Sequence, residues 1–193
     1  MKLKNPVPEK RIGLVIDLDR CWGCKACEVA CKQELGIGAG TIRPMLVVEI
    51  GPRTVGGTLQ RDFVPVMCQH CLQPACIEAC PVEAIYRASD GTVQIDPDLC
   101  ERCGLCESAC PFGVISLTEE HGPIKCTLCM SRRENGWLPG CAQHCEGRAF
   151  TVADEKEIVS VVRRKKYAWS TGQVTYVSDK WADLGKAFPE DPR

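Results

Sequence analysis

The chain has 193 residues, with 24 basic and 25 acidic side chains, so it has no basic excess for binding a nucleic-acid backbone. It contains 16 cysteines but only 4 Phe, 4 Trp and 3 Tyr, and we expect a group bound to sulfur to do part of the work of a conventional core. No apolar stretch reaches the roughly 18 residues of a membrane helix, and residues 1–20 lack an apolar signal region and paired arginines. These features argue against a direct membrane span and against self-export.

Secondary structure is predicted in the segments between the cysteines. Residues 45–50 and 59–66 are β-prone runs separated by Gly and Pro, and they predict a hairpin. Residues 86–95 predict a short two-stranded ribbon with an Asp-Gly turn. Residues 154–169 predict a helix that opens with a capping box, and its basic run at 163–166 is expected to be a solvated face.

The cysteines fall into four groups, with none left over. In chain order the groups are Cys21, Cys24, Cys27 and Cys31; Cys68, Cys71, Cys76 and Cys80; Cys100, Cys103, Cys106 and Cys110; and Cys126, Cys129, Cys141 and Cys145. Closely spaced cysteines followed three residues later by another are typical of paired 4Fe-4S clusters, in which that last cysteine binds the neighbouring cluster. Pro81 and Pro111 follow two of these last cysteines, as in bacterial ferredoxins, whereas Lys32 and Glu146 stand at the other two positions.

Sixteen ligands at four per cluster predict four 4Fe-4S clusters. Because a cluster with four thiolate ligands leaves no iron open to substrate, we assign no catalytic residue. Other uses of cysteine fit less well. Structural disulfides need an oxidising compartment, a thioredoxin-type site needs only one C-x2-C pair, and zinc ribbons use two separated pairs, commonly with histidine, of which the chain has 3.

The four motifs, in this order, resemble the iron-sulfur electron-transfer subunits of the dimethyl sulfoxide reductase family, the complex iron-sulfur molybdoenzymes. The resemblance covers residues 12–150 and is carried by residues 16–21, 68–76, 96–100 and 125–141. It implies an α+β fold of tandem bacterial-ferredoxin-like modules, in which two interleaved halves each hold two 4Fe-4S clusters. The implied plan is an outer half at 12–35 and 119–153, a β-hairpin insertion at 36–66, an inner half at 67–118 and a C-terminal docking tail at 154–193.

The resemblance also implies which cysteines share a cluster. The first set is Cys21, Cys24, Cys27 and Cys145; the second is Cys31, Cys126, Cys129 and Cys141; the third is Cys68, Cys71, Cys76 and Cys110; the fourth is Cys80, Cys100, Cys103 and Cys106. Some relatives with a three-iron cluster replace a cysteine of the third sequence group. All four are present here, and we therefore expect only 4Fe-4S clusters.

The function implied by the resemblance is that of a non-catalytic subunit of an oxidoreductase. It would relay electrons between a molybdenum or tungsten pterin catalytic subunit, near the first and second sets, and an external donor or acceptor, such as a membrane anchor, a ferredoxin or another redox subunit. A cytoplasmic location is expected, with export alongside a signal-bearing partner as the alternative. A subunit of a tungsten aldehyde oxidoreductase and a free polyferredoxin carrier remain alternative functions. A cluster-based sensor would need an output module, which the sequence does not indicate.

A few other side chains are candidates for supporting roles. His70 lies between two cysteines, and we expect it to have a hydrogen-bonding or packing role rather than a role in proton transfer. Three lysines each adjoin a cysteine: Lys25, Lys32 and Lys125. A nearby positive charge stabilises a reduced cluster, so these lysines are candidates for tuning its potential. Simple compensation of the negative cluster charge is the role we expect by default. As an alternative to a solvated face, the basic run at 163–166 forms a docking surface for a partner together with late aromatic residues: Tyr167, Trp169, Tyr176 and Trp181.

Overall fold

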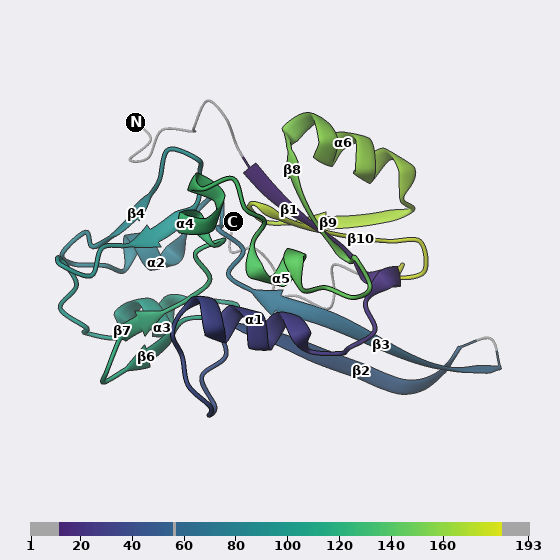
Figure 1. Cartoon of the computed structure of the whole chain (residues 1–193), viewed down its shortest axis with the longest axis horizontal. Coiled ribbons are helices and arrows are strands. Elements are labelled where there is room, and N and C mark those ends of the chain that lie inside the picture. The colour runs from purple at the N-terminus through teal and green to yellow at the C-terminus, as the bar shows by residue number, and fades with distance from the viewer. Residues whose placement is uncertain (1–11, 56, 183–193) are drawn as a thin grey trace.

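A computed structural model describes residues 12–55 and 57–182 of the chain (Figure 1). Its elements are β1 (Ile12–Asp17), a 3-10 helix (Leu18–Arg20), α1 (Ala26–Glu34), β2 (Met45–Val55), β3 (Thr58–Met67), α2 (Ala75–Glu78), β4 (Ile85–Arg87), β5 (Val93–Ile95), α3 (Leu105–Ala109), β6 (Ser116–Thr118), β7 (Gly122–Ile124), α4 (Met130–Glu134), α5 (Gly140–Gln143), β8 (Phe150–Asp154), α6 (Glu155–Arg164), β9 (Tyr167–Ser170) and β10 (Val174–Ser178). Short helices and short antiparallel strands are mixed along the chain, which agrees with the predicted α+β class.

A four-stranded sheet ties the beginning of the chain to its end. The strand order is β8-β1-β10-β9, with β1 antiparallel to β8 and parallel to β10. Alternate residues of β1 face opposite sides, as the pleat of a strand requires. Leu14 and Ile16 belong to the main core, whereas Val15 packs with Ile158 and Val162 of α6. The helix α6 therefore covers one face of the sheet, and the cysteine-rich part of the molecule lies against the other (Figure 1).

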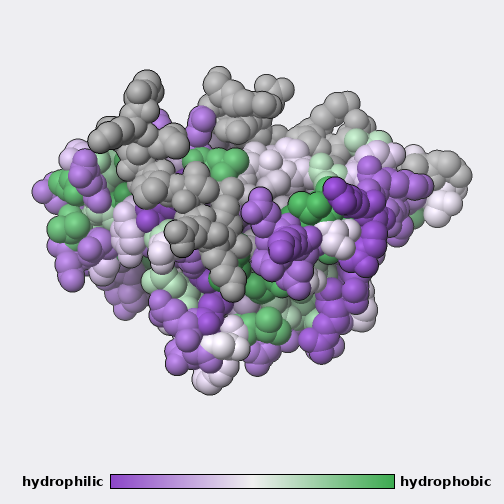
Figure 2. Space-filling view, turned by 90° about the horizontal axis from the view of Figure 1, so that it is seen from above, coloured by the Kyte–Doolittle hydropathy of each residue, from purple (hydrophilic) through white to green (hydrophobic). Residues whose placement is uncertain are grey.

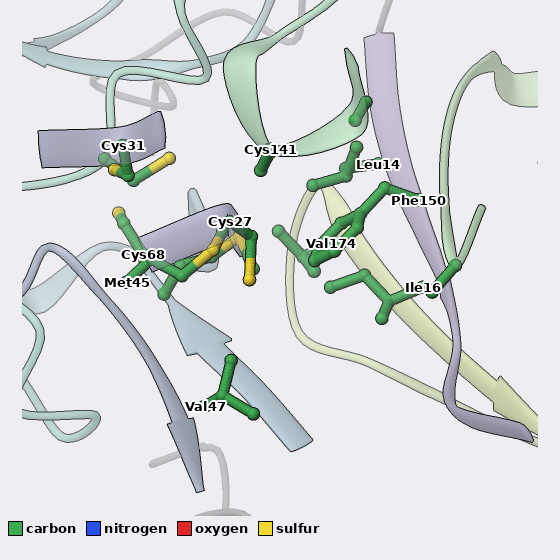
Figure 3. Packing of buried hydrophobic residues seen from close by; sticks show 14 of the residues in the cluster. Leu14, Ile16, Cys27, Cys31, Met45, Val47, Cys68, Cys141, Phe150 and Val174 are labelled. Carbon is green, nitrogen blue, oxygen red and sulfur yellow. The ribbon is translucent and has the colours of Figure 1, made fainter. Parts of the chain in front are cut away.

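The main core is built from apolar side chains and cysteines together. Figure 3 shows Cys27, Cys31 and Cys68 in the same packed region as Leu14 and Val174. All five residues are at most 7% exposed. The sulfur groups thus occupy the place that large aromatic side chains hold in an ordinary core of this size.

The predicted hairpin and ribbon are confirmed. Strands β2 and β3 pair antiparallel and extend from the body as a long two-stranded arm (Figure 1). At the base of this arm, the ring of Phe63 packs on Gly23, where an added Cβ would lie 2.6 Å from Cγ of Phe63. The strands β4 and β5 form the predicted ribbon, and Asp90 at its turn accepts hydrogen bonds from the backbone and hydroxyl of Thr92. The strands β6 and β7 form a second ribbon of the same size.

The segment after Phe150 differs from the expected tail. The capping box is present, because Asp154 accepts a hydrogen bond from the backbone N–H of Glu157 and the Glu157 carboxylate accepts one from the N–H of Asp154. The helix, however, ends at Arg164 instead of near Trp169. The chain then forms β9 and β10, and the buried strand β10 pairs with β1 on one side and with β9 on the other, which satisfies its backbone groups inside the sheet. Residues 183–193 of the predicted tail lie outside the described residues.

The late aromatic side chains pack internally. Tyr176 is fully buried, and its hydroxyl donates to Pro65 O at 2.8 Å, so it cannot serve as a docking surface. The ring of Trp169 packs against Tyr176 with centroids 5.7 Å apart. Trp181 donates its indole N–H to Asp62 at 3.0 Å. Tyr176 is therefore unavailable to a partner, whereas Tyr167, Trp169 and Trp181 are partly buried.

Lys165 forms ion pairs, whereas the basic run at 163–166 was predicted to be a solvated face. Its ammonium group contacts the carboxylates of Asp17, Asp19 and Asp179 at 3.0 to 3.2 Å. On the face seen in Figure 2, hydrophilic side chains predominate and the visible hydrophobic residues form separate groups. Within residues 12–55 and 57–182, no helix has the length and apolar composition needed to cross a bilayer.

Candidate iron-sulfur sites

Each cysteine group begins with the same backbone turn. The residue before the second cysteine has a positive φ in all four groups: Gly23 (71°), His70 (47°), Arg102 (57°) and Leu128 (52°). A left-handed residue inside a short loop turns successive backbone N–H groups toward one point and forms a concave site for negatively charged atoms. The inorganic sulfides and thiolates of an iron-sulfur cluster are atoms of this kind.

Two cavities are each lined by four cysteines. One is walled by apolar side chains that include Val93 and Phe112. Its cysteines are Cys68, Cys71, Cys76 and Cys110. The other lies between Val82 and Pro123. Its cysteines are Cys80, Cys100, Cys103 and Cys106. The structure therefore gathers the members of the third set in one place and those of the fourth set in another.

The first set is brought together from distant parts of the chain. Burial raises the pKa of Cys27 to about 12, and the next contributions come from the negative charges of Cys21, Cys24 and Cys145. Likewise, burial is the largest cause of the raised pKa of Cys21, which also interacts with Cys145 and Cys24. Such mutual effects require short distances between the thiols.

The second set is assembled in the same way. Burial raises the pKa of Cys141 well above its usual value, followed by the charges of Cys126, Cys129 and Cys31. The pKa of Cys31 is raised by burial and then by Cys126 and Cys129. The helices α1 and α5, which carry Cys31 and Cys141, pack against each other and hold these thiols in place.

Thiols of neighbouring sets also interact. Cys27 of the first set acts on Cys31 and Cys141 of the second. Burial raises the pKa of Cys126 to about 12, and the charge of Cys68 is the next cause, which links the second set to the third. Cys76 of the third set likewise interacts with Cys106 of the fourth.

The electrostatics of the sets fit a bound group that carries positive iron. Four buried thiolates would repel one another, and this is why burial and neighbouring thiols raise the pKa of Cys71 and Cys76 to about 12. Iron ions relieve that repulsion, so cluster binding favours the deprotonated ligands. Backbone N–H groups also point at sulfur: Leu128 N donates to Cys126 Sγ at 3.3 Å and Ala149 N donates to Cys145 Sγ at 3.2 Å.

Among the described residues, no three His, Cys, Asp or Glu side chains are grouped as ligands of a single metal ion. Most of the thiols are buried or half-buried, whereas Cys24 of the first set and Cys103 of the fourth set are exposed.

His70 is neutral and held in one orientation. It is fully buried, and its Nδ1 accepts a hydrogen bond from Val93 N at 2.9 Å, so Nε2 carries the hydrogen. Burial, followed by the charges of Lys125, Arg133 and Arg87, lowers its pKa well below the usual value. The residue is therefore a fixed hydrogen-bonding side chain in the loop between Cys68 and Cys71.

The three lysines next to cysteines have different surroundings. Lys25 is exposed and precedes α1 in a left-handed conformation. Lys32 donates to Gly38 O and Gly40 O at 3.3 and 2.8 Å near the surface. Lys125, in contrast, is only 3% exposed, so its charge lies inside the protein.

One part of the site could not be foreseen from the cysteine pattern. The turn between β9 and β10 packs on the loop between Cys68 and Cys71, where Gln173 N donates to Gln69 O at 2.9 Å and Leu72 N donates to Thr171 O at 3.1 Å. Gly172 lies between these two hydrogen bonds and fits directly against the backbone of Gln69 and His70. These partners are about a hundred residues apart in sequence, and neither segment carries a local signal of the contact.

Known iron-sulfur domains match most of the cysteine-rich sequence. The 4Fe-4S binding domain family matches residues 14–34, and the 4Fe-4S dicluster domain family matches residues 59–155. Together these two matches contain every cysteine of the four groups. The domains are ferredoxin-like, and the 16 cysteines suffice for four 4Fe-4S clusters.

Similar curated proteins are subunits of reductases. The sequence is 33% identical to the B subunit of the anaerobic dimethyl sulfoxide reductase of Escherichia coli, over 80% of this chain and 77% of that protein. It is 34% identical to the B subunit of the tetrathionate reductase of Salmonella typhimurium, over 78% of this chain and 60% of that protein. It is 31% identical to the B subunit of the selenate reductase of Mesobacillus selenatarsenatis, over 83% of this chain and 66% of that protein. The sequence thus spans less than two thirds of the length of the last two relatives.

The cysteine sets, the domain matches and these similarities agree with one another. This protein belongs to the family of iron-sulfur electron-transfer subunits that includes the B subunits of the dimethyl sulfoxide, tetrathionate and selenate reductases.

Proposed function

We propose that the chain holds its four 4Fe-4S clusters in the four cysteine sets and that these sets form one linear electron path. The observation that carries this assignment is the grouping of the thiols, since two cavities are each lined by one complete set. The raised pKa values of Cys27 and Cys141 support the same grouping for the first and second sets, after burial as the main cause. The proposed path enters or leaves the protein at the exposed residues Cys24 and Cys103.

The proposed domain plan follows from this assignment. Cys145 joins the first group of cysteines, and Cys31 joins the last, so the outer half combines residues 12–35 with 119–153. The inner half, residues 67–118, is inserted between them after the hairpin insertion at 36–66. The folded part of the segment 154–193 completes the sheet around β1 and braces the loop between Cys68 and Cys71. In the proposal, this segment contacts a partner only through the side chains on its outer surface.

The protein side of electron transfer consists of holding, shielding and charge compensation. A bound cluster supplies a centre that accepts and releases one electron, and four thiolate ligands leave none of its iron open to substrate. The cysteines hold the centres in a row, and apolar residues such as Val93 and Phe112 exclude water from the third set. Backbone N–H groups of Leu128 and Ala149 donate to ligand sulfur and stabilise its negative charge.

The proposed partner is a catalytic subunit with a molybdenum or tungsten pterin, since relatives of this chain are B subunits of reductases. The first set faces that subunit in the proposal, and Trp22, which is 65% exposed beside Cys21, forms part of the contact. The fourth set faces a second redox partner, such as a membrane anchor or a ferredoxin. The complex works in the cytoplasm or is exported together with a partner that carries the signal.

The test of the path is the substitution Cys103→Ser in the anaerobically prepared complex, with Ser108→Ala on the exposed side of α3 as the matched control. Cys103→Ser should alter one cluster signal in electron paramagnetic resonance and slow electron exchange with the second partner, while the clusters of the first and second sets remain reducible. The control should keep every signal. Loss of all cluster signals in Cys103→Ser, or no change in any of them, would contradict the assignment.

The partner is tested by anaerobic isolation from the native host with measurement of molybdenum and tungsten. Co-elution of either metal with the chain would support the catalytic partner. Elution of the chain as a lone 21.2 kDa species would instead favour a free carrier.

A further inference from the structure

Lys125 is a buried cation without a carboxylate partner among the residues that the structure describes. It is 3% exposed, and its ammonium group donates to the carbonyl oxygens of Val93 and Cys126, the latter at 3.0 Å. By contrast, the buried guanidinium of Arg133 contacts the Asp90 carboxylate at 2.6 Å. An unpaired buried charge is costly unless a group of opposite charge lies nearby.

The position of Lys125 shows where that opposite charge would come from. Its ammonium group donates to the carbonyl oxygen of Cys126, a member of the second set. It also donates to the carbonyl oxygen of Val93, a residue that lines the cavity of the third set. The one ammonium group therefore lies beside two neighbouring sets.

The neighbouring charged and titratable groups differ from Lys125. Arg87 donates to the carbonyl oxygens of Cys71 and Leu72 on the third set alone. His70 is buried beside Lys125 and stays neutral, and Arg133 is paired with Asp90. The site is shielded from water, so a unit charge acts there with a lower effective dielectric constant than at the surface. The hydrogen bonds to Val93 and Cys126 fix the ammonium group between the strand β5 and the loop that begins the last cysteine group.

We propose that Lys125 sets the electron affinity of the second and third sets together and so favours electron residence in the middle of the path. The inference rests on the proposed function, because it requires clusters in these two sets. Each centre gains one electron on reduction, with no bond formed or broken, and the added negative charge is stabilised by the ammonium group. Lys125 is thus a positioning residue for charge and not a ligand.

The test is a redox titration of the holoprotein, followed by electron paramagnetic resonance, in the variants K125M, K125Q and K125R. In both neutral variants, two of the clusters should become harder to reduce, with a fall of about tenfold in their ratio of reduced to oxidised form at a fixed potential. The other two should titrate as in the unaltered protein. K125R, which keeps the charge, should restore the ratio.

Lys32→Met is the matched comparison, because Lys32 also adjoins a cysteine and donates to two carbonyl oxygens but lies near the surface. Its effect should be much smaller than that of K125M, since water screens an exposed charge. Unchanged potentials in K125M and K125Q, with all clusters present, would overturn this inference and leave the proposed function intact. An equal shift in the potentials of all four clusters, or loss of iron from both neutral variants, would show that Lys125 has a structural role and would also overturn the inference. Absence of four clusters from the unaltered protein would instead contradict the proposed function.

Discussion

The substitution Gly172→Ala tests how the C-terminal sheet holds an iron-sulfur site. An added Cβ at this position would lie 2.5 Å from His70 O and closer still to Gln69 O, both of them backbone atoms of the loop between Cys68 and Cys71. Real Cβ atoms do not approach other atoms closer than 3.0 Å, so the loop or the turn must move by several tenths of an ångström. Backbone on both sides leaves no flexible side chain to absorb the movement.

The size of the effect follows from the contacts that this movement disturbs. Overpacking of a close contact costs about 1 to 3 kcal/mol. The hydrogen bonds from Gln173 N to Gln69 O and from Leu72 N to Thr171 O lie on either side of Gly172, and weakening them adds about 1 kcal/mol. A total of about 3 kcal/mol corresponds to a fall of about 6 to 12 °C in the thermal midpoint for a chain of this size.

The assay compares thermal midpoints of the anaerobic holoprotein at one scan rate, together with the rate of iron release. Gly172→Ala should lower the midpoint by the stated amount and lose the cluster of the third set first. Gly38→Ala is the matched control, because an added Cβ there meets no atom within 4 Å. A midpoint for Gly172→Ala equal to that of the control would refute the proposed contact between the turn and the cysteine loop.

Two further substitutions test the sheet and its surface. Tyr176→Phe should lower stability by about 1 to 3 kcal/mol, measured by the same thermal assay, because it removes the hydrogen bond to Pro65 O and leaves a buried acceptor unpaired. Lys165→Met should destabilise most near pH 7. In the native protein, hydrogen bonds from Asp179 N, Ser178 and Lys165 outweigh burial and lower the pKa of Asp19. The contribution of Asp19 to the free energy of unfolding is therefore present above the unfolded pKa of 3.8 and is lost as the pH falls through the lowered value. Without Lys165, the pKa of Asp19 is lowered less, so the difference in stability from the unaltered protein should narrow as the pH falls toward 3.8. A difference that does not change with pH would contradict this explanation.

The local elements of the fold were predictable because their signals lie within a few residues. The β-prone runs around residues 51–57 predicted the hairpin, the Asp-Gly turn predicted the ribbon of β4 and β5, and Asp154 with Glu157 predicted the start of α6. The cysteine spacing likewise predicted the loop that begins each group, because its first cysteines lie within a few residues of one another. The last cysteine of each group is assigned to a set that includes cysteines of another group.

The long-range parts of the fold carried no such signal. Strand β10 is buried at every position and therefore lacks the alternation that marks a half-exposed strand, and its pairing with β1 joins residues about 160 apart. The same limit applies to Lys165, whose three aspartate partners come from two distant segments. The contact of Gly172 with the cysteine loop depends on that pairing, so it appears only once the sheet is assembled.

Every cysteine is proposed to serve one of four 4Fe-4S clusters. The content of iron, acid-labile sulfide and zinc in anaerobically purified protein, together with native mass spectrometry of the intact chain, tests this assignment. We expect about sixteen iron and sixteen sulfide per chain, four of each for every cluster. Zinc in place of iron, or iron enough for only two clusters in fully loaded protein, would contradict it.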